Sequence, residues 1–249
     1  MSSALTRPTS RPLNYWICLG IPVVIAIALC LLELTDIDMD IEKLFYSSVD
    51  HAFIGRHSHW LEDILHDRAK QLVIAIGVFG ALGYFASFKV KRLMPIRKEL
   101  ACLVVAMTLA TSYTPPLKTV TGVQCPWDLT EFGGKETYSK LFEHRPVAIE
   151  AGRCWPGGHA ATGFALFALF FVLRDRRPRM ARVGLGVALG LGTLFSVVRM
   201  VQGAHFLSHN VWAAIFCWVI CLGTYRVMLY RPYKATEQEP APEASVATS

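Results

Sequence analysis

The chain has 249 residues, of which 53% are hydrophobic and 18% are charged, and its mean hydropathy is +0.37. Soluble domains carry fewer apolar residues and nearer a quarter charged residues, so this composition argues against a cytosolic enzyme, a disordered regulator or a fibrous protein. Seven cysteines exclude a disulfide-dense secreted module, although one isolated bridge remains open. The length fits one membrane domain with several spans.

Six apolar segments are long enough to cross a bilayer, which takes roughly 20 mostly apolar residues. We predict spans at about 14–34, 71–88, 100–117, 157–173, 183–201 and 211–230. A cleavable signal peptide is the alternative for the first segment. It fits poorly, because the apolar run is long and LTDIDMD follows it instead of a small-residue cleavage site. The predicted fold class is therefore all-α, a polytopic membrane protein built as a bundle of six transmembrane helices.

The charged residues of the connections predict an orientation. Lysine and arginine gather in the N-terminus, in the second-to-third and fourth-to-fifth connections and after the sixth span. Acidic residues gather in two long loops, about 35–70 and 118–156. The positive-inside rule places residues 1–13 and 234–249 in the cytoplasm and both loops in the periplasm, around a membrane domain at 14–233 in a bacterial inner membrane. The net charge of +6 is then a topology signal, and we expect no nucleic-acid partner.

Two segments outside the predicted spans have distinct compositions. Residues 35–70 contain IEKLFYSSV and HWLEDIL, with apolar positions at helical spacing. They fit an amphipathic helix lying at the membrane surface, or equally a loop that packs on the bundle. The tail 234–249 is small, acidic and proline-bearing, so we expect it to be disordered.

Three polar clusters lie at the outward ends of the predicted spans, where ionisable residues are costly and usually have a reason. They cover residues 118–128, 153–159 and 199–210. In the second cluster, Pro156–His159 opens a predicted helix and offers unpaired N–H groups and a positive dipole end to a phosphate-sized anion. Gly157 and Gly158 let that backbone approach a ligand closely. Further charge-assisted donors are Lys118, Arg153 and Arg199.

Histidines occur in two of these clusters. His159 and His205 can supply a nucleophile and a proton donor. The structural alternatives are that the basic residues snorkel, that the glycine pair serves helix packing, and that His205 and His209, four residues apart, form a metal pair. Because all three clusters fall on one side of the predicted membrane, we favour a single anion site at the periplasmic helix ends.

These residues resemble the type 2 phosphatidic acid phosphatase superfamily of membrane lipid phosphatases. Its signature is a Lys, six residues and Arg-Pro, then Pro-Ser-Gly-His, then Ser-Arg, five residues, His, three residues and Asp. In this chain Lys118 is followed by six residues and Cys125-Pro126, so a cysteine stands at the family's arginine. Pro156–His159 matches the second motif, with Gly157 in place of serine.

The third motif matches in the same partial way. Arg199 is followed by five residues and His205, then by three residues and His209. Val198 stands at the family's serine and His209 at its aspartate. The resemblance covers about residues 60–230 and includes the six spans and the order of the motifs. It implies a six-helix lipid phosphatase that needs no metal or cofactor.

The resemblance also implies roles for these residues. His205 attacks the phosphorus and forms a phosphohistidine, and His159 protonates the leaving oxygen and then activates water. The phosphoryl oxygens are held by Lys118, Arg199 and the N–H groups of Gly157 and Gly158.

Three further residues concern the two positions at which this chain lacks the arginine and the aspartate of the family signature. Arg153 is a candidate to replace the missing arginine in space. His209 can accept a hydrogen bond but cannot supply the negative charge of the missing aspartate, which Asp128 can supply from the second loop.

The cysteines divide into two groups. Five lie within apolar spans, where cysteine behaves as a small hydrophobe. Cys125 and Cys154 lie on the outward side, where an oxidising periplasm permits a disulfide between them. A zinc site that combines these thiols with His159, His205 or His209 is the alternative. The compartment and the metal independence implied by the resemblance favour the disulfide.

The functional prediction is an integral-membrane phosphatase or phosphotransferase that acts on a lipid phosphate or pyrophosphate at the periplasmic face. Its partners are the bilayer and the lipid substrate. By resemblance, candidate substrates are undecaprenyl pyrophosphate, phosphatidylglycerol phosphate, phosphatidic acid and the phosphates of lipid A. One alternative is a non-catalytic membrane protein of the same fold that binds or transports a lipid or anion. A metal-binding membrane protein that uses the histidines and outward cysteines is a third.

Overall fold

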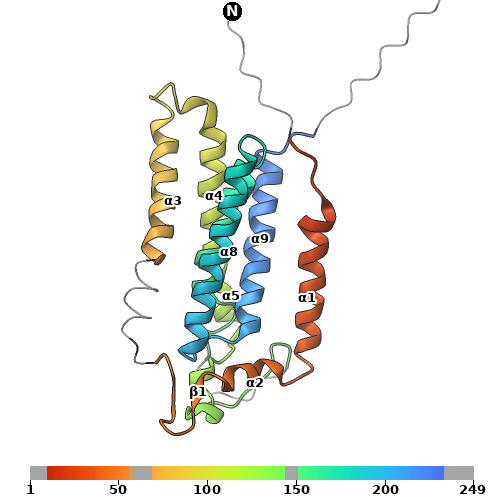
Figure 1. Cartoon of the computed structure of the whole chain (residues 1–249), viewed down its shortest axis with the longest axis vertical. Helices are drawn as coiled ribbons and strands as arrows, with labels where there is room; N and C mark the ends of the chain where they lie inside the picture. Colours follow the sequence, from red (N-terminus) through yellow and green to blue (C-terminus); the bar gives the residue numbers. More distant parts are fainter. Residues whose placement is uncertain (1–9, 57, 59–68, 144–150, 233–249) are drawn as a thin grey trace, which may run out of the picture.

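A computed structural model of the chain describes residues 10–56, 58, 69–143 and 151–232. Long helices run side by side along the longest axis, and short elements cover one end of them (Figure 1). The prediction of a helical protein is confirmed. The helices of the bundle are η1 (Trp16–Gly20), α1 (Ile21–Leu32), α3 (Ala69–Ala86), η3 (Met94–Ile96), α4 (Arg97–Ser112), α5 (Thr114–Thr121), α6 (Gly158–Phe164), α7 (Phe167–Leu173), α8 (Pro178–Val201) and α9 (Leu207–Met228).

Each of the six predicted apolar segments is helical, but their lengths differ. Met94–Asp128, Pro178–Val201 and Leu207–Met228 are long and apolar enough to cross a membrane, and the bent pair Trp16–Leu32 and Ile37–Lys43 would make a fourth span. Lys70–Ala86 and Gly158–Leu173 are apolar but shorter. The described residues therefore contain three or four candidate spans, and the count of six stays a prediction.

The third predicted span does not end at Leu117. After α4 the chain starts α5, in which Pro115 and Pro116 occupy the first turn, where a missing N–H breaks no helical hydrogen bond. α5 ends at Gly122, whose φ of 59° is the left-handed conformation common after a helix. Lys118 consequently lies inside a helix rather than directly after one.

The first long loop contains short elements that pack on the bundle. α2 (Ile37–Lys43) bends 82° from the helix before it, and β1 (Tyr46–Ser47) pairs antiparallel with β2 (Ala52–Phe53). Phe53 packs in a cluster with Phe132 and Phe206. The helical expectation holds only for α2 within IEKLFYSSV, and the packed-loop alternative describes the rest of it. HWLEDIL lies outside the described residues.

The second long loop also packs against the bundle end. It contains the short helices η4 (Pro126–Asp128) and η5 (Thr130–Phe132), and Trp127 N–H donates to the Gly203 carbonyl at 2.9 Å. Both loops therefore cover the helix ends that carry the three polar clusters.

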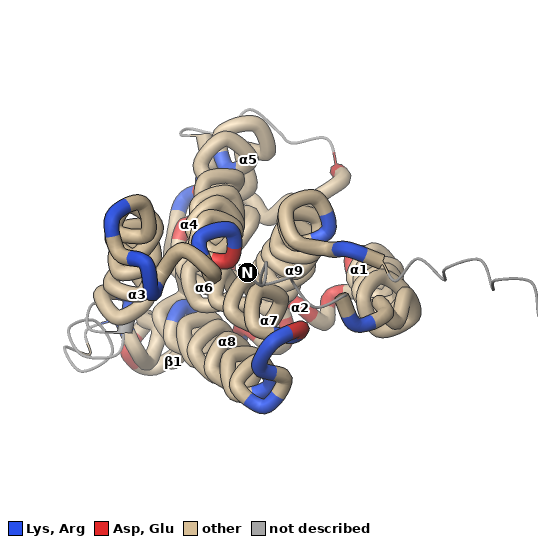
Figure 2. The backbone as a smooth tube through the Cα atoms, turned by 90° about the horizontal axis from the view of Figure 1, so that it is seen from above, with Lys and Arg blue, Asp and Glu red and all other residues tan. Residues whose placement is uncertain are grey.

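Close helix contacts define the core. Seen along the bundle, α6 and α7 lie at the centre, with α4, α8 and α9 around them and α1 and α3 on opposite sides (Figure 2). A Cβ at Gly163 would lie 2.6 Å from the Gly192 backbone nitrogen, so glycine permits α6 and α8 to touch. η1 and α1 expose large apolar residues, such as Trp16 and Leu31, as expected for helices in contact with lipid.

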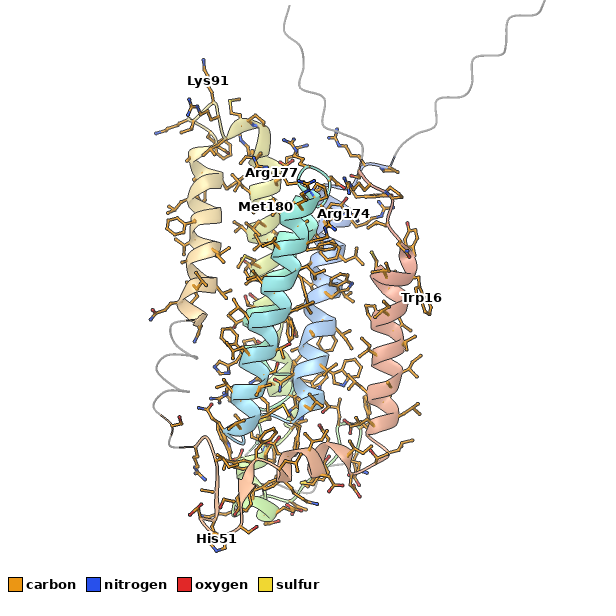
Figure 3. The ribbon with its side chains drawn as sticks, viewed as in Figure 1. Trp16, His51, Lys91, Arg174, Arg177 and Met180 are labelled. Carbon is orange, nitrogen blue, oxygen red and sulfur yellow. A yellow bond between two sulfur atoms is a disulfide. The ribbon has the colours of Figure 1, made fainter. Side chains whose placement is uncertain are left out.

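Charge is separated along the axis of the bundle. Lys91, Arg174 and Arg177 lie at one end, and His51 lies at the other, beside the short elements (Figure 3). We call the first end the basic end. The three polar clusters lie at the opposite end.

Candidate active site

Four separate segments bring basic side chains together at this opposite end. Lys118 comes from α5, His159 from the first turn of α6, Arg199 from the end of α8, and His205 from the short connection before α9. The charged groups that act electrostatically on His205 are Lys118, His209, Arg199 and His159, in that order. Five of the predicted site residues therefore converge on one place.

The connection that carries His205 is fixed by a glycine. Gly203 has a φ of 75°, and a Cβ there would lie 2.3 Å from the Phe53 ring, so both its conformation and the hairpin above it require glycine. The Ala204 N–H donates to the Arg199 carbonyl at 2.8 Å and closes the turn after α8. This turn buries His205, which is 2% exposed.

Burial controls the protonation of His205. The pKa of the imidazole lies well below its usual value, chiefly because burial disfavours the charged form, and the positive charge of Lys118 lowers it further. A neutral imidazole keeps a lone pair for attack on an electrophile. His205 Nδ1 lies 3.2 Å from Cys154 Sγ. Nε2 is then the nitrogen available to a substrate.

A distant carboxylate holds the first turn of α9. Asp38 from α2 accepts the Ser208 N–H at 3.1 Å and the Ser208 hydroxyl at 2.5 Å. α9 has no side-chain cap from its own preceding residue, so Asp38 satisfies an N–H group that would otherwise be unpaired. This contact joins residues 170 positions apart, and no sequence signal identified it.

The two glycines before His159 differ in their surroundings. Gly157 N–H donates to the His209 carbonyl at 3.0 Å, so we revise its predicted role as a phosphate donor. A Cβ at Gly157 would lie 2.4 Å from Asn210 Oδ1, so a serine at this position would require the Asn210 side chain to move. A Cβ at Gly158 would lie 3.6 Å from Lys118 Nζ, which places the ammonium group beside the start of α6.

Arg199 is held at the edge of the cluster by two residues that the sequence analysis did not assign to the site. Its Nη1 donates to Gln202 Oε1 at 2.9 Å, and its guanidinium carbon lies 5.4 Å from the centre of the Trp127 ring. A cation over an indole face is a favourable contact. Trp127 thereby links the second loop to the cluster of basic side chains.

Arg153 lies elsewhere. It is exposed and lines an outer cavity of about 890 Å³ together with Asp128, Lys135 and Glu136. Cys125 and Trp127 form the side of this cavity nearest Arg199. Arg153 is therefore in a position to meet the outer part of a ligand, and it does not take the place of the family's missing arginine beside His205.

Asp128 belongs to the turn that carries the cysteine. Its Oδ2 accepts the Cys125 N–H at 3.4 Å, and its own N–H donates to the Cys125 carbonyl at 2.9 Å. These bonds cap η4, and Asp128 is not among the groups that shift the pKa of His205. The geometry gives Asp128 a structural contact and leaves its predicted catalytic role as a prediction.

Cys125 and Cys154 are joined in the structure, with Cα atoms 5.1 Å apart, a separation within the usual range for a disulfide. The alternative zinc site has matching geometry, since one ligand atom each from Cys154, His205 and His209 lies within 4.8 Å of the others. Zinc takes cysteine as a thiolate, and here the Cys154 sulfur is bonded to Cys125. This donor set therefore does not fit zinc while the disulfide is intact.

The sequence that builds this bundle matches a known protein family. The model of the PAP2 superfamily matches residues 99–233, more than half of the chain and all three motifs, so the chain belongs to this superfamily. It is 27% identical over 226 residues to the lipid A 4'-phosphatase of Francisella tularensis subsp. novicida (strain U112), across 86% of this chain and 96% of that protein. No solved structure matches the chain.

Proposed function

We propose that this protein is an integral-membrane lipid phosphatase that works through a phosphohistidine at His205. The observation that carries the proposal is a buried, neutral imidazole set among Lys118, Arg199 and His159. Membership in the PAP2 superfamily and the lipid A 4'-phosphatase relative support a phosphatase. A phosphotransferase would share the first half of the reaction.

The first step is transfer of the phosphoryl group to His205. The Nε2 lone pair forms a bond to phosphorus while the bond from phosphorus to the lipid oxygen breaks in line with it. Lys118 and Arg199 balance the charge that spreads over the equatorial oxygens. His159 donates a proton to the departing oxygen. The lipid leaves with a free hydroxyl group.

The second step releases the enzyme. His159, now deprotonated, accepts a proton from a water molecule as its oxygen attacks the phosphohistidine. The bond between Nε2 and phosphorus breaks, its electron pair returns to the imidazole, and inorganic phosphate departs. Nδ1 of His205 contacts the Cys154 sulfur, a weak acceptor, whereas the family signature provides a carboxylate to hold this nitrogen.

For the substrate, we propose the phosphate of a glycolipid of the lipid A class. The relative's name supports this choice. The outer cavity of about 890 Å³ supports it too, because its lining includes Gln124, Lys135, Glu136 and Arg153, which suit the hydroxyl and phosphate groups of a sugar headgroup. Phosphatidic acid and undecaprenyl pyrophosphate offer no such headgroup.

For the location, we propose a six-span inner-membrane protein with the site in the periplasm and both termini in the cytoplasm. The gathering of basic residues at the end opposite the site supports this orientation. Reporter fusions after Lys135 and after Arg177 test it. We expect a periplasmic signal from the first and a cytoplasmic signal from the second, and the reverse pattern would contradict the proposal.

The deciding experiment is phosphate release from lipid A, phosphatidic acid and undecaprenyl pyrophosphate by purified protein with a chelator present. We expect release from lipid A, loss of release in His205→Ala, and normal release in His51→Ala. His51 is an exposed histidine at the same end of the molecule, so it controls for the substitution itself. Binding of lipid A without release from any lipid would favour the non-catalytic alternative.

A further inference from the structure

A second cavity system lies at the basic end, between α1 and the bundle. α1 stands apart from α8 and α9 (Figure 1). A cavity of about 590 Å³ opens there, and its lining includes Arg11, Arg174, Arg179 and Arg182. No step of the proposed reaction uses these residues.

An apolar groove continues from this cavity. It has a volume of about 290 Å³ and is lined only by apolar residues, among them Ile21 and Ile25 of α1, Leu189 of α8 and Ala214 of α9. Ile17 and Trp218 line both spaces, so the groove begins where the basic cavity ends. The groove follows η1 and α1 from Ile17 to Ile25.

The cavity carries uncompensated positive charge. Arg174 is partly balanced by Asp175 at 3.7 Å, and its Nη2 donates to the carbonyls of Arg11 and Pro12 at 3.1 and 3.0 Å. Arg179 and Arg182 are exposed and form no ion pair with any described residue. The start of α8 is coloured as basic in the view down this end (Figure 2). An anion placed here therefore meets guanidinium groups with few competing carboxylates.

A hydrogen bond joins the two helices at the junction between the basic cavity and the apolar groove. Trp218 Nε1 donates to the Cys18 carbonyl at 2.8 Å and ties α9 to η1, directly before α1. The order along the site is thus arginines, then an indole, then aliphatic side chains. A phospholipid presents the same order, with a charged phosphate, a polar glycerol backbone and an acyl chain.

We propose that this is a binding site for an anionic diacyl phospholipid of the leaflet at the basic end. Its phosphate lies among Arg11, Arg179 and Arg182, and one acyl chain fills the groove between α1 and α9. A soluble anion would leave the groove empty, and a zwitterionic lipid would bring no net charge to the arginines. The site is separate from His205, so it stands whether or not the protein is a phosphatase.

The test uses the purified full chain in a neutral detergent and native mass spectrometry. The probes are phosphatidylglycerol and phosphatidylcholine with identical acyl chains, and neither is a phosphomonoester. We expect several-fold greater retention of phosphatidylglycerol. The double variant Arg179→Gln/Arg182→Gln should lower that retention to the level of phosphatidylcholine.

Two further variants make the result specific. Lys91→Gln/Arg92→Gln removes the same charge from exposed positions at the same end, outside the cavity, and should retain phosphatidylglycerol as the wild type does. Ala214→Phe should fill the groove and lower retention with every arginine intact. If it does not fold, the two charge variants still decide the question.

Three outcomes would overturn the proposal. Equal retention of the two lipids by the wild type would show that no headgroup site exists. Unchanged retention of phosphatidylglycerol in Arg179→Gln/Arg182→Gln would show that these arginines do not bind the lipid phosphate. Retention that develops only after residues 234–249 are removed would identify the acidic tail, and not a lipid, as the occupant.

Discussion

His205 Nδ1 lies 3.2 Å from Cys154 Sγ, and Cys154 is bonded to Cys125. The orientation of the proposed nucleophile is therefore coupled to a covalent link between two loops. In catalytic histidines a carboxylate commonly holds the far nitrogen and stabilises the imidazolium. A sulfur can hold the ring but supplies no negative charge. The disulfide and the missing carboxylate therefore both act on the same imidazole, that of His205.

The first prediction concerns the proton donor. His159→Ala should slow turnover by about 10²–10⁴-fold, the usual range for a lost general acid–base group. Phosphoenzyme should still form, because His205 is intact, and should persist longer because water is no longer activated. Rapid quench and detection of acid-labile, base-stable phosphate on the protein measure this. Unchanged phosphoenzyme lifetime in folded His159→Ala would contradict the assigned role.

The second prediction concerns the disulfide. Cys125 and Cys154 are 29 residues apart, and closing such a loop contributes about 3–4 kcal/mol in the chain-entropy model. Cys154→Ser should lower the midpoint of thermal unfolding and also lower turnover, because it removes the sulfur beside His205. Cys30→Ser is the control, since Cys30 is free and exposed. Mass spectrometry of unreduced peptides should find the Cys125–Cys154 link. Two free thiols at these positions would contradict the predicted disulfide.

The third prediction restores the family's carboxylate. His209 is buried, and its Nδ1 has no hydrogen-bond partner among the described residues. The His205 and His209 ring centres are 6.0 Å apart. His209→Asp should raise the rate of phosphate release, because a carboxylate near His205 stabilises the imidazolium as charge develops. A lower rate in well-folded protein would mean that His209 has a function of its own.

Asp128 provides the companion measurement. Asp128→Asn keeps an oxygen that can accept the Cys125 N–H, so it should preserve the cap of η4. If Asp128 only caps this turn, Asp128→Asn should retain activity and Asp128→Ala should lose stability. Strong loss of activity in a stable Asp128→Asn protein would instead show that Asp128 supplies the negative charge of the family's aspartate.

The fourth prediction concerns the cap of α9. Asp38→Ala should destabilise the protein by about 0.5–2 kcal/mol, the usual cost of a lost cap, and lower kcat by disturbing the turn after His205. Asp40→Ala on the same short helix is the matched control, because Asp40 is exposed and, among the described residues, its ion pair is with Lys43 at the surface. Thermal unfolding and steady-state kinetics of both variants distinguish the loss of the helix cap from the general effect of removing a carboxylate.

The fifth prediction follows from the low pKa of His205. An unfolded histidine titrates near 6.5, whereas buried His205 resists protonation. The unfolded state therefore binds more protons below about pH 6.5, and stability falls as the pH decreases through that value. In His205→Gln this contribution is absent, so its unfolding midpoint should depend less steeply on pH between about 6.5 and 5. Parallel curves for the two proteins would show that His205 titrates normally.

Motif spacing predicted the residues that converge, and it could do so because each motif is local. Lys118, His159 and His205 each sit at a helix end or turn that their own neighbours define. Asp38 and Trp127 were missed, because their roles depend on contacts with segments far along the chain. Spacing alone gives no signal for such contacts.

Helix ends were predicted less well than helix positions. The third span was predicted to end at about residue 117, whereas the structure starts a new helix before that point, with Pro115 and Pro116 in its first turn, where proline is favoured. Arg153 was placed near the nucleophile from its closeness in sequence to His159. The chain between them turns through Trp155 and Pro156, and Arg153 lies in the outer cavity instead.

The space beside Gly157 couples the effects of substitutions at two positions of this chain. A Cβ at position 157 and Asn210 Oδ1 would occupy nearly the same volume, only 2.4 Å apart. Gly157→Ser alone should therefore be harmful, and Asn210→Ala should relieve the clash, so the two changes are epistatic rather than additive. The effect of a substitution at position 157 therefore depends on the residue at position 210, and the two positions have to be substituted together.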